Sequence, residues 1–267
     1  MTVFQAVILG ILQGIAEFLP ISSSAHLTLA PWVFGWADPG LSFDVALHFG
    51  TLLAVLWYFR AEWMRLVTAA WEIVTTRSIA TDEQRRVAFL VVATIPGAIA
   101  GLALEKQAES AFRAPALIAV AMMILGVILW GVDRYARQDR GLSGMTWRDA
   151  LVIGCAQMFA IVPGVSRSGS TITAGRAMGL TREDAAVFSF LMSMPIIAAA
   201  AILKVPHALR ESGLSAALVA GVLASAISGW LAISVLVRFV RTRSYGVFAI
   251  YRLVLGAAVI WLVLARG

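Results

Sequence analysis

The sequence predicts an all-α polytopic membrane protein, and three observations support this fold class. Of the 267 residues, 60% are hydrophobic and 13% are charged, whereas a soluble domain has about 45–50% apolar and about 25% charged residues. Long apolar runs follow one another along the chain, and about 20 such residues cross a bilayer as one helix. Two further runs are short and break into polar loops. We therefore expect six transmembrane helices plus two re-entrant helix–loop–helix elements in an inverted internal repeat.

The uninterrupted runs are the expected membrane spans. They cover residues 42–59, 87–104, 115–132, 185–203, 214–237 and 246–264. Segment 61–84, between the first two spans, mixes tryptophans with charged residues. This pattern predicts an interfacial helix with its aromatic rings at headgroup level.

The two interrupted runs differ from the spans in length and polarity. Residues 3–19 carry Gln13 and Glu17 and end at Pro20, and residues 150–162 carry Gln157 and end at Pro163. Each proline is followed by a serine-rich stretch. Polar, irregular backbone at membrane depth is tolerated only where protein buries it or water lines it. We therefore expect both segments to be re-entrant.

A weak internal repeat aligns these two segments. At an offset of 144 residues, Gly10 meets Gly154, Gln13 meets Gln157, Ser22 meets Ser166 and Ser24 meets Ser168. Interrupted segments at corresponding places in two halves point to the binding site of an inverted-repeat membrane protein. The sequence thus predicts one integral membrane domain. It is divided into a first repeat (1–132), a solvated cytoplasmic linker (133–148) and a second repeat (149–267).

Charge placement predicts the topology. Most arginines fall on one side of the proposed spans, and the positive-inside rule makes that side cytoplasmic. The loop after Pro20 then approaches from outside and the loop after Pro163 from the cytoplasm. The net charge of +6 is explained by these loop arginines, so no nucleic-acid partner is expected. The single cysteine, Cys155, excludes an internal disulfide.

Glu17 and Gln13 are the candidate metal ligands. They stand four residues apart in one helix and share a face. A carboxylate at membrane depth is costly and usually has a functional role. Oxygen-only ligation suits Mg²⁺ or Ca²⁺ and leaves room for phosphate oxygens. The alternative is a polar pair that only packs two helices together.

The stretch Ser166-Arg167-Ser168-Gly169-Ser170-Thr171 resembles a phosphate cradle. Glycine allows close backbone approach, a helix N-terminus favours anions, and arginine supplies a bidentate fork matched to phosphate. Arg167 is the candidate catalytic cation. The candidate substrate-binding residues here are Ser166, Ser168, Gly169 and Thr171. The alternative is a helix cap with one snorkelling arginine.

Ser23 and His26 are the candidate nucleophile and base. In a helix they would be neighbours, and a serine beside a histidine is a common arrangement for an activated hydroxyl. Ser22 and Ser24 are candidates for substrate binding. The alternative is that the three serines only cap a helix. His48, at the start of a span, is a weaker candidate for lining the site.

Two stretches carry a family resemblance. Gln13-Gly-Ile-Ala-Glu17-Phe-Leu-Pro20-Ile-Ser-Ser23-Ser-Ala-His26 and Pro163-Gly-Val-Ser-Arg167-Ser-Gly-Ser-Thr171 resemble motifs of the undecaprenyl-pyrophosphate phosphatase family, the bacitracin-resistance type. By position, Glu17, Ser23, His26 and Arg167 fall on residues implicated in catalysis in that family. Gln13 stands where many members have glutamate, which lowers the local negative charge.

The resemblance implies a bacterial inner-membrane hydrolase that needs a divalent cation. It would cleave undecaprenyl pyrophosphate to undecaprenyl phosphate and inorganic phosphate, recycling the lipid carrier of peptidoglycan synthesis and conferring bacitracin resistance. Its partners would be this lipid substrate and membrane lipids, with a homodimer left open. The topology, which brings the first loop from outside and the second from the cytoplasm, favours an active site open to the periplasm. The alternative is an inverted-repeat transporter or flippase of a polyprenyl phosphate.

Overall fold

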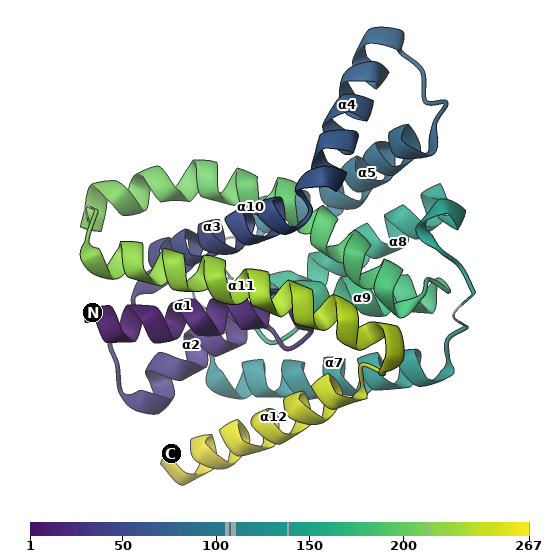
Figure 1. The fold of residues 1–267 in the computed structure, drawn as a ribbon. Coiled ribbons are helices and arrows are strands. Elements are labelled where there is room, and N and C mark those ends of the chain that lie inside the picture. The colour runs from purple at the N-terminus through teal and green to yellow at the C-terminus, as the bar shows by residue number, and fades with distance from the viewer. Residues whose placement is uncertain (105–106, 108–110, 138, 213, 267) are drawn as a thin grey trace.

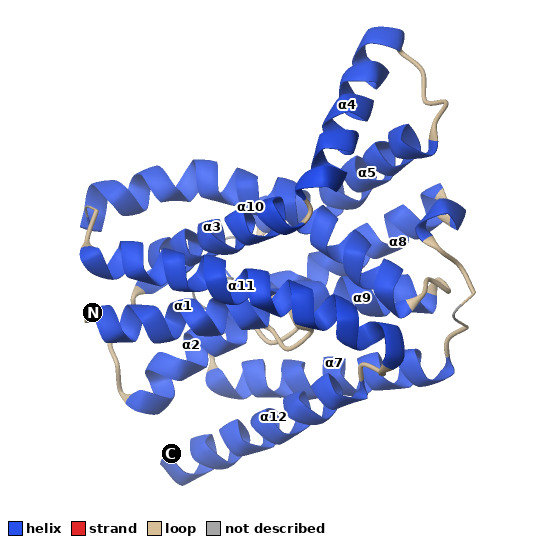
Figure 2. Cartoon of the chain, viewed as in Figure 1, coloured by secondary structure: helices blue, strands red, loops and turns tan. Residues whose placement is uncertain are grey.

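A computed structural model describes residues 1–104, 107, 111–137, 139–212 and 214–266 of the chain. The described residues form a bundle of α-helices joined by loops and short 3₁₀ turns (Figures 1 and 2). Several of the long helices run roughly along one common direction, and both chain ends lie at the same end of the bundle (Figure 1). The predicted all-helical class is therefore confirmed.

Five of the described helices are long and apolar enough to cross a bilayer. They are α5 (Asp82–Ala103), α7 (Pro115–Tyr135), α10 (Arg182–Ser212), α11 (Ala216–Thr242) and α12 (Gly246–Arg266). A sixth candidate is α3 (Gly40–Tyr58), which passes the test together with α4 (Arg60–Thr76). The six predicted spans overlap α3, α5, α7, α10, α11 and α12, so the structure supports five spans, or six with the bent pair counted as one.

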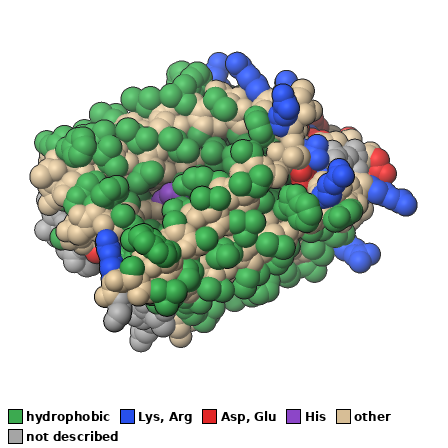
Figure 3. Space-filling model, turned by 90° about the horizontal axis from the view of Figure 1, so that it is seen from below, with side chains coloured by type: hydrophobic (Ala, Val, Ile, Leu, Met, Phe, Trp, Pro, Cys, Tyr) green, Lys and Arg blue, Asp and Glu red, His purple; other side chains and the backbone are tan. Residues whose placement is uncertain are grey.

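The outer surface of the bundle suits a lipid environment. Large apolar side chains such as Ile99, Val127 and Val235 are exposed on the long helices. Hydrophobic side chains cover most of the face in Figure 3, and most of the visible cationic side chains gather at one end. An exposed apolar surface of this extent marks a membrane-facing protein.

The segment expected to be interfacial changes direction sharply. Helix α4 leaves the axis of α3 at 86° and projects from the bundle beside the start of α5 (Figure 1). The predicted segment 61–84 runs too far, because α4 ends at Thr76 and Thr81 caps the next helix with a reciprocal bond to Gln84.

Four short helices form the two interrupted segments. Helices α1 (Val3–Phe18) and α2 (Ser23–Phe34) have 16 and 12 residues, and α8 (Trp147–Met158) and α9 (Arg167–Ala177) have 12 and 11. At about 1.5 Å per residue, none reaches across the roughly 30 Å hydrocarbon layer. The loops that join α1 to α2 and α8 to α9 meet inside the bundle (Figure 1).

The two loops have the same local geometry. Ser22 and Ser166 each adopt a left-handed backbone conformation, with φ of 77° and 75°. Each caps the helix that follows, since Ser22 Oγ accepts from the Ala25 N–H and Ser166 Oγ accepts from the Gly169 N–H. A non-glycine residue at positive φ is strained and persists only where its surroundings hold it.

The linker expected to be solvated is partly buried. Asp133 is 2% exposed, and its carboxylate accepts from Arg176 Nε (3.0 Å), Arg182 Nε (2.8 Å) and the Tyr245 N–H (2.9 Å). The expectation of a solvated position is therefore wrong for Asp133. Arg176 is fully buried and Arg182 is half-buried. A buried arginine requires a compensating carboxylate, and Asp133 supplies it.

Candidate active site

Glu17, near the end of α1, meets Arg167, the first residue of α9. Arg167 Nη2 donates to Glu17 Oε1 at 2.7 Å, and Arg167 Nη1 donates to the Ser189 carbonyl at 2.9 Å. The side chains of Glu17 and Arg167 are 5% and 13% exposed. A charged pair this deep is retained only with good geometry and further hydrogen bonds, and both conditions hold here.

The second carboxylate oxygen of Glu17 gathers three more polar groups. Ser23 Oγ donates to Glu17 Oε2 at 2.6 Å, and Gln13 Nε2 donates to the same oxygen at 3.1 Å. His48 Nε2, from α3, lies 3.4 Å from it. Glu17 is therefore the centre of the cluster, and Ser23 is bonded to this carboxylate.

Two helix N-termini open onto this cluster. Ser23 is the first residue of α2 and Arg167 is the first residue of α9. The loops before these helices are bonded to each other, because the Gly164 N–H donates to Ser22 Oγ at 3.0 Å and Ser168 Oγ donates to the Leu19 carbonyl at 3.0 Å. The first N–H groups of a helix lack intrahelical acceptors and carry a partial positive charge. The arrangement can bind an anion.

The serines and the threonine expected to bind substrate form hydrogen bonds within the protein. Ser166 Oγ caps α9 and lies 3.2 Å from Ser168 Oγ. Thr171 Oγ1 donates to the Arg167 carbonyl at 2.8 Å and lies 2.7 Å from Ser189 Oγ. Ser22, Ser166, Ser168 and Thr171 are buried, whereas Ser23 and Ser24 are half-buried.

Gly169 is required by close packing. A Cβ at this position would lie 2.9 Å from Arg252 Nη1 and 3.0 Å from Ser166 Cβ. The glycine thus lets the Arg252 guanidinium approach the start of α9.

The structure does not bring His26 to Ser23 by a hydrogen bond. His26 Nδ1 lies 2.7 Å from the Ser22 carbonyl, and Nε2 lies 2.6 Å from the Tyr251 hydroxyl. Tyr251 was not predicted from the sequence, because it lies 225 residues after His26 and no local pattern marks it as a site residue.

Sequence reasoning also missed Arg252, which ties the two loops together. Its guanidinium donates to the carbonyls of Met122 (2.9 Å), Pro20 (3.1 Å), Gly164 (2.7 Å) and Val165 (3.1 Å). The sequence did contain a signal for Arg252, because an arginine inside an apolar span is rare and usually has a functional role. His48, a weaker candidate from the sequence, contacts the central carboxylate.

The cluster offers oxygen donors to a hard cation. Gln13 Oε1 is buried and has no hydrogen-bond partner, and it belongs to the side chain whose amide nitrogen contacts Glu17. Within the described part of the chain, no group of three or more His, Cys, Asp or Glu side chains could hold a metal ion. Protein oxygens alone therefore provide part of a coordination shell, and phosphate oxygens and water would have to complete it.

A chain of polar contacts leads from one end of the bundle to the cluster. Arg113 Nη2 lies 2.8 Å from Asp38 Oδ2, and Arg113 Nη1 lies 3.7 Å from Asp44 Oδ2. His48 Nδ1 lies 2.7 Å from the Asp44 carbonyl, and its Nε2 is the group near Glu17. Asp38 is exposed and Asp44 is 6% exposed, so these contacts run inward from the surface.

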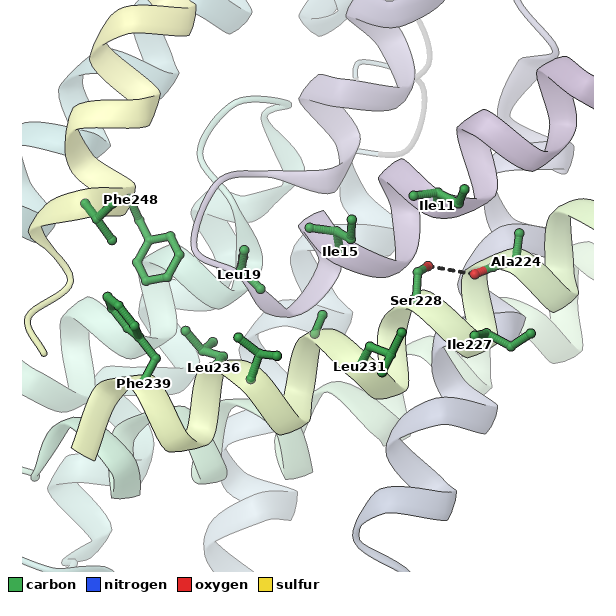
Figure 4. A pocket seen from close by; sticks show the side chains of 13 residues that line it. Ile11, Ile15, Leu19, Ala224, Ile227, Ser228, Leu231, Leu236, Phe239 and Phe248 are labelled. Carbon is green, nitrogen blue, oxygen red and sulfur yellow. Dashed lines mark hydrogen bonds between the residues drawn. The ribbon is translucent and has the colours of Figure 1, made fainter. Parts of the chain in front are cut away.

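An apolar groove of about 800 Å³ lies beside the first loop. Side chains of α1, α11 and the start of α12 line it, among them Ile15, Leu231 and Phe248 (Figure 4). Leu19 lies in its wall (Figure 4), and the Leu19 carbonyl accepts from Ser168. The groove therefore reaches the loop that carries the cluster.

Comparison with known proteins assigns the chain to a family. The family model described as bacitracin resistance protein BacA matches residues 6–258. The undecaprenyl-diphosphatase of Gemmatimonas aurantiaca is 58% identical, covering 97% of each chain. That of Moorella thermoacetica is 51% identical over 98% of this chain and 99% of its own, and that of Pelotomaculum thermopropionicum is 49% identical over 100% and 98%. This chain therefore belongs to the bacitracin resistance protein BacA family.

Proposed function

We propose that the chain is an undecaprenyl-diphosphatase, a membrane hydrolase that cleaves undecaprenyl diphosphate to undecaprenyl phosphate and inorganic phosphate. Relatives at 49–58% identity over nearly the whole chain carry that name. The observation that carries the proposal is the 2.7 Å contact between Arg167 and Glu17, with Ser23 on the same carboxylate at 2.6 Å.

The geometry favours Ser23 as the nucleophile. Its Oγ attacks the terminal phosphorus, the bond from that phosphorus to the bridging oxygen breaks, and undecaprenyl phosphate leaves. Glu17 Oε2 accepts the Ser23 proton, because it already accepts the hydroxyl hydrogen bond. Water then hydrolyses the phosphoserine and regenerates Ser23. Arg167 and the N–H groups that open α2 and α9 stabilise the charge on the phosphoryl oxygens.

Direct attack by His26 is the other route. It requires a free ring nitrogen, and both nitrogens of His26 are held by Ser22 and Tyr251. The contacts therefore support the serine route.

A divalent cation, Mg²⁺ or Ca²⁺, would be held by Gln13 Oε1 and Glu17. The unpartnered buried oxygen of Gln13 supports this, as does the preference of these cations for oxygen ligands. When bound, the cation would neutralise charge on the diphosphate. Chelation is expected to abolish phosphate release, and Gln13→Glu to tighten the apparent cation affinity because it adds a negative charge.

The isoprenoid tail would lie in the groove between α1, α11 and α12. Its apolar lining and its contact with Leu19 support this placement. Ile15→Trp is expected to raise KM for undecaprenyl diphosphate and to leave KM for a short isoprenyl diphosphate unchanged. An equal change with both substrates would contradict the placement.

We place the protein in the bacterial inner membrane with the site open to the periplasm. The polar contacts from Asp38 through Arg113 to His48 support an opening at the end away from most arginines. In a Cys155→Ser background, Ser24→Cys is expected to react with an impermeant thiol reagent added to spheroplasts. Reaction only in inverted vesicles would contradict this orientation.

A polyprenyl-phosphate flippase is the second candidate function. The matched backbone of Ser22 and Ser166 in two loops that meet inside the bundle supports an inverted repeat, and such repeats are typical of transporters. A carrier would release no phosphate in detergent, which separates the two functions. A homodimer stays a prediction that light scattering in detergent can test.

The direct test is phosphate release from undecaprenyl diphosphate by the purified protein in detergent with a divalent cation. Glu17→Gln removes the charge but keeps the shape and is expected to lower kcat on the order of 10³-fold. Arg167→Lys keeps the charge but loses the fork, with an expected loss of about 10²-fold. Arg65→Lys, at a side chain that is 70% exposed, is the control. Full activity in either site variant would contradict the proposal.

A further inference from the structure

His26 lies between two partners, one in its own loop and one in the last helix. Its Nδ1 contacts the Ser22 carbonyl at 2.7 Å and its Nε2 contacts the Tyr251 hydroxyl at 2.6 Å. The rings of His26 and Tyr251 stack with centroids 5.7 Å apart and planes at 11°. His26 is 8% exposed, so the ring is fixed on its edge and on its face.

The acceptor chemistry sets the direction of these bonds. A carbonyl oxygen can only accept, so His26 Nδ1 carries the hydrogen and donates to Ser22. In the neutral ring, Nε2 then has the lone pair and accepts from the Tyr251 hydroxyl. The result is a chain of donors that runs from Tyr251 through His26 to the Ser22 carbonyl.

This chain ends on a strained residue. Ser22 has φ of 77° and directly precedes Ser23. Such a conformation persists only where several contacts hold it. The Gly164 N–H holds the Ser22 hydroxyl, while the His26 ring and the His26 N–H hold its carbonyl.

The second loop is held in a different way. Arg252 donates to two of its carbonyls, Gly164 and Val165, but to only one carbonyl of the first loop, Pro20. The residue that corresponds to His26 at the repeat offset is Ser170, whose hydroxyl donates to the Arg167 carbonyl. His26 and Tyr251 thus supply the first loop with support that Arg252 does not give it.

We propose that Tyr251 is a positioning residue for the phosphatase reaction. Through His26 it holds the Ser22 carbonyl, and thereby fixes the direction in which Ser23 presents its hydroxyl to Glu17. This inference rests on the proposed function and assigns His26 to positioning, acting through Ser22, with no direct proton transfer to or from the substrate.

A substitution series at position 26 tests the proposal. His26→Asn keeps a donor where Nδ1 stands but has no Nε2, whereas His26→Gln places its amide near Nε2 and His26→Ala has neither. We expect His26→Asn to keep kcat within about threefold of the wild type, and His26→Ala and His26→Gln to lose about tenfold or more, with little change in KM. Equal, severe losses in all three variants would overturn the proposal, because a base or nucleophile cannot be replaced by asparagine.

A double-mutant cycle isolates Tyr251. Tyr251→Phe is expected to lower kcat about two- to threefold in the wild-type background, the same loss as His26→Asn, and to have no further effect in the His26→Asn background, since the Nε2 partner is gone. Tyr135→Phe, at a tyrosine that is 79% exposed, is the matched control. Full activity of Tyr251→Phe, or additive losses in the cycle, would overturn the proposal.

A spectroscopic measurement provides a readout independent of turnover. In protein with ¹⁵N-labelled histidine, the His26 resonances, assigned by their loss in His26→Asn, should report the Nδ1–H tautomer. Tyr251→Phe should shift the Nε2 resonance, and an unshifted resonance would overturn the proposal. If the wild type releases no phosphate, the proposed function fails and the spectra still test the Tyr251–His26 contact.

Discussion

Single buried charges organise the centre of the molecule. Arg252 is fully buried, and its guanidinium donates hydrogen bonds to four carbonyl oxygens. A planar guanidinium has five donors in a rigid fork and can reach several acceptors that point in different directions. The residue therefore joins α7, the α1–α2 loop and the α8–α9 loop to α12.

Replacement of Arg252 by lysine tests whether the planar shape of the guanidinium is needed or only its positive charge. Lysine keeps the charge but cannot reach all four carbonyls, so buried acceptors lose their partners. We expect Arg252→Lys to lower the free energy of unfolding by about 3 kcal/mol, measured as a lower unfolding midpoint in detergent, and to lower kcat. Arg65→Lys is the control. A variant as stable and as active as the wild type would contradict this role.

The sequence predicted the charged members of the site better than their supports. Glu17 and Arg167 stand out because a charge is costly in an apolar segment. Tyr251 and His48 give no comparable signal, since a tyrosine or a histidine in a span is most often part of the packing. Tyr251 contacts His26, which lies 225 residues earlier in the chain, and His48 contacts Glu17, which lies 31 residues earlier. Local sequence patterns do not reveal contacts between residues this far apart.

At the scale of elements, glycines allow the short helices to approach their neighbours. A Cβ on Gly10 of α1 would lie 2.3 Å from the Gly221 carbonyl oxygen in α11, and a Cβ on Gly154 of α8 would lie 2.6 Å from the Ala93 carbonyl oxygen in α5. These obstacles are backbone atoms that cannot rotate away. Helices α1 and α8 therefore pack against their neighbours in the same way, through a glycine that faces a backbone carbonyl.

Alanine at either glycine should therefore destabilise the protein. We expect Gly10→Ala and Gly154→Ala to lower the free energy of unfolding by about 1–3 kcal/mol, as overpacking does. Gly131→Ala in α7 is the matched control, because nothing lies within 4 Å of its added Cβ and alanine favours a helix. Midpoints measured in detergent test this, and equal midpoints for all three variants would contradict it.

The ion pair between Asp149 and Arg140 at the start of α8 should stabilise the folded protein at neutral pH but not in acid. Asp149 Oδ2 lies 2.7 Å from Arg140 Nη2 and accepts from the Thr146 N–H. Burial raises the pKa of Asp149, but the bonds from Arg140 and Thr146 outweigh it and hold the pKa below its usual value. The stabilisation is present above the unfolded pKa of about 3.9 and is lost as the pH falls through the lower folded pKa.

The expected result is a falling unfolding midpoint below about pH 4, with a shallower fall in Asp149→Asn. Exposed Asp139→Asn is the control and should follow the wild type. Identical pH profiles for the wild type and Asp149→Asn would show that the Asp149 carboxylate contributes nothing to the free energy of unfolding.

The sequence predicted which elements exist more reliably than where they end. Hydropathy identified the run 150–162, but α8 stops at Met158 and a 3₁₀ turn continues to Ile161. Apolar composition does not distinguish a helix from an apolar turn. The break at Pro20 was predictable because proline cannot continue the hydrogen bonding of a helix.

At the scale of the whole molecule, two halves of the chain contribute to one site. The first supplies Glu17, Ser23 and His48, and the second supplies Arg167 and the Tyr251–Arg252 pair. The α1–α2 loop and the α8–α9 loop meet inside the bundle (Figure 1), where the Gly164 N–H donates to Ser22 Oγ. The motifs in the sequence predict that the two loops meet, but they do not predict which atoms of the two loops are in contact.

In the proposed reaction, Ser23, which is hydrogen-bonded to Glu17, receives the phosphoryl group. The most direct measurement is acid quenching of the enzyme during turnover of undecaprenyl diphosphate with a ³²P-labelled terminal phosphate, followed by mass spectrometry of the labelled peptide. We expect phosphate on Ser23, and we expect neither label nor turnover in Ser23→Ala. Phosphate on His26, or full turnover by Ser23→Ala, would contradict it.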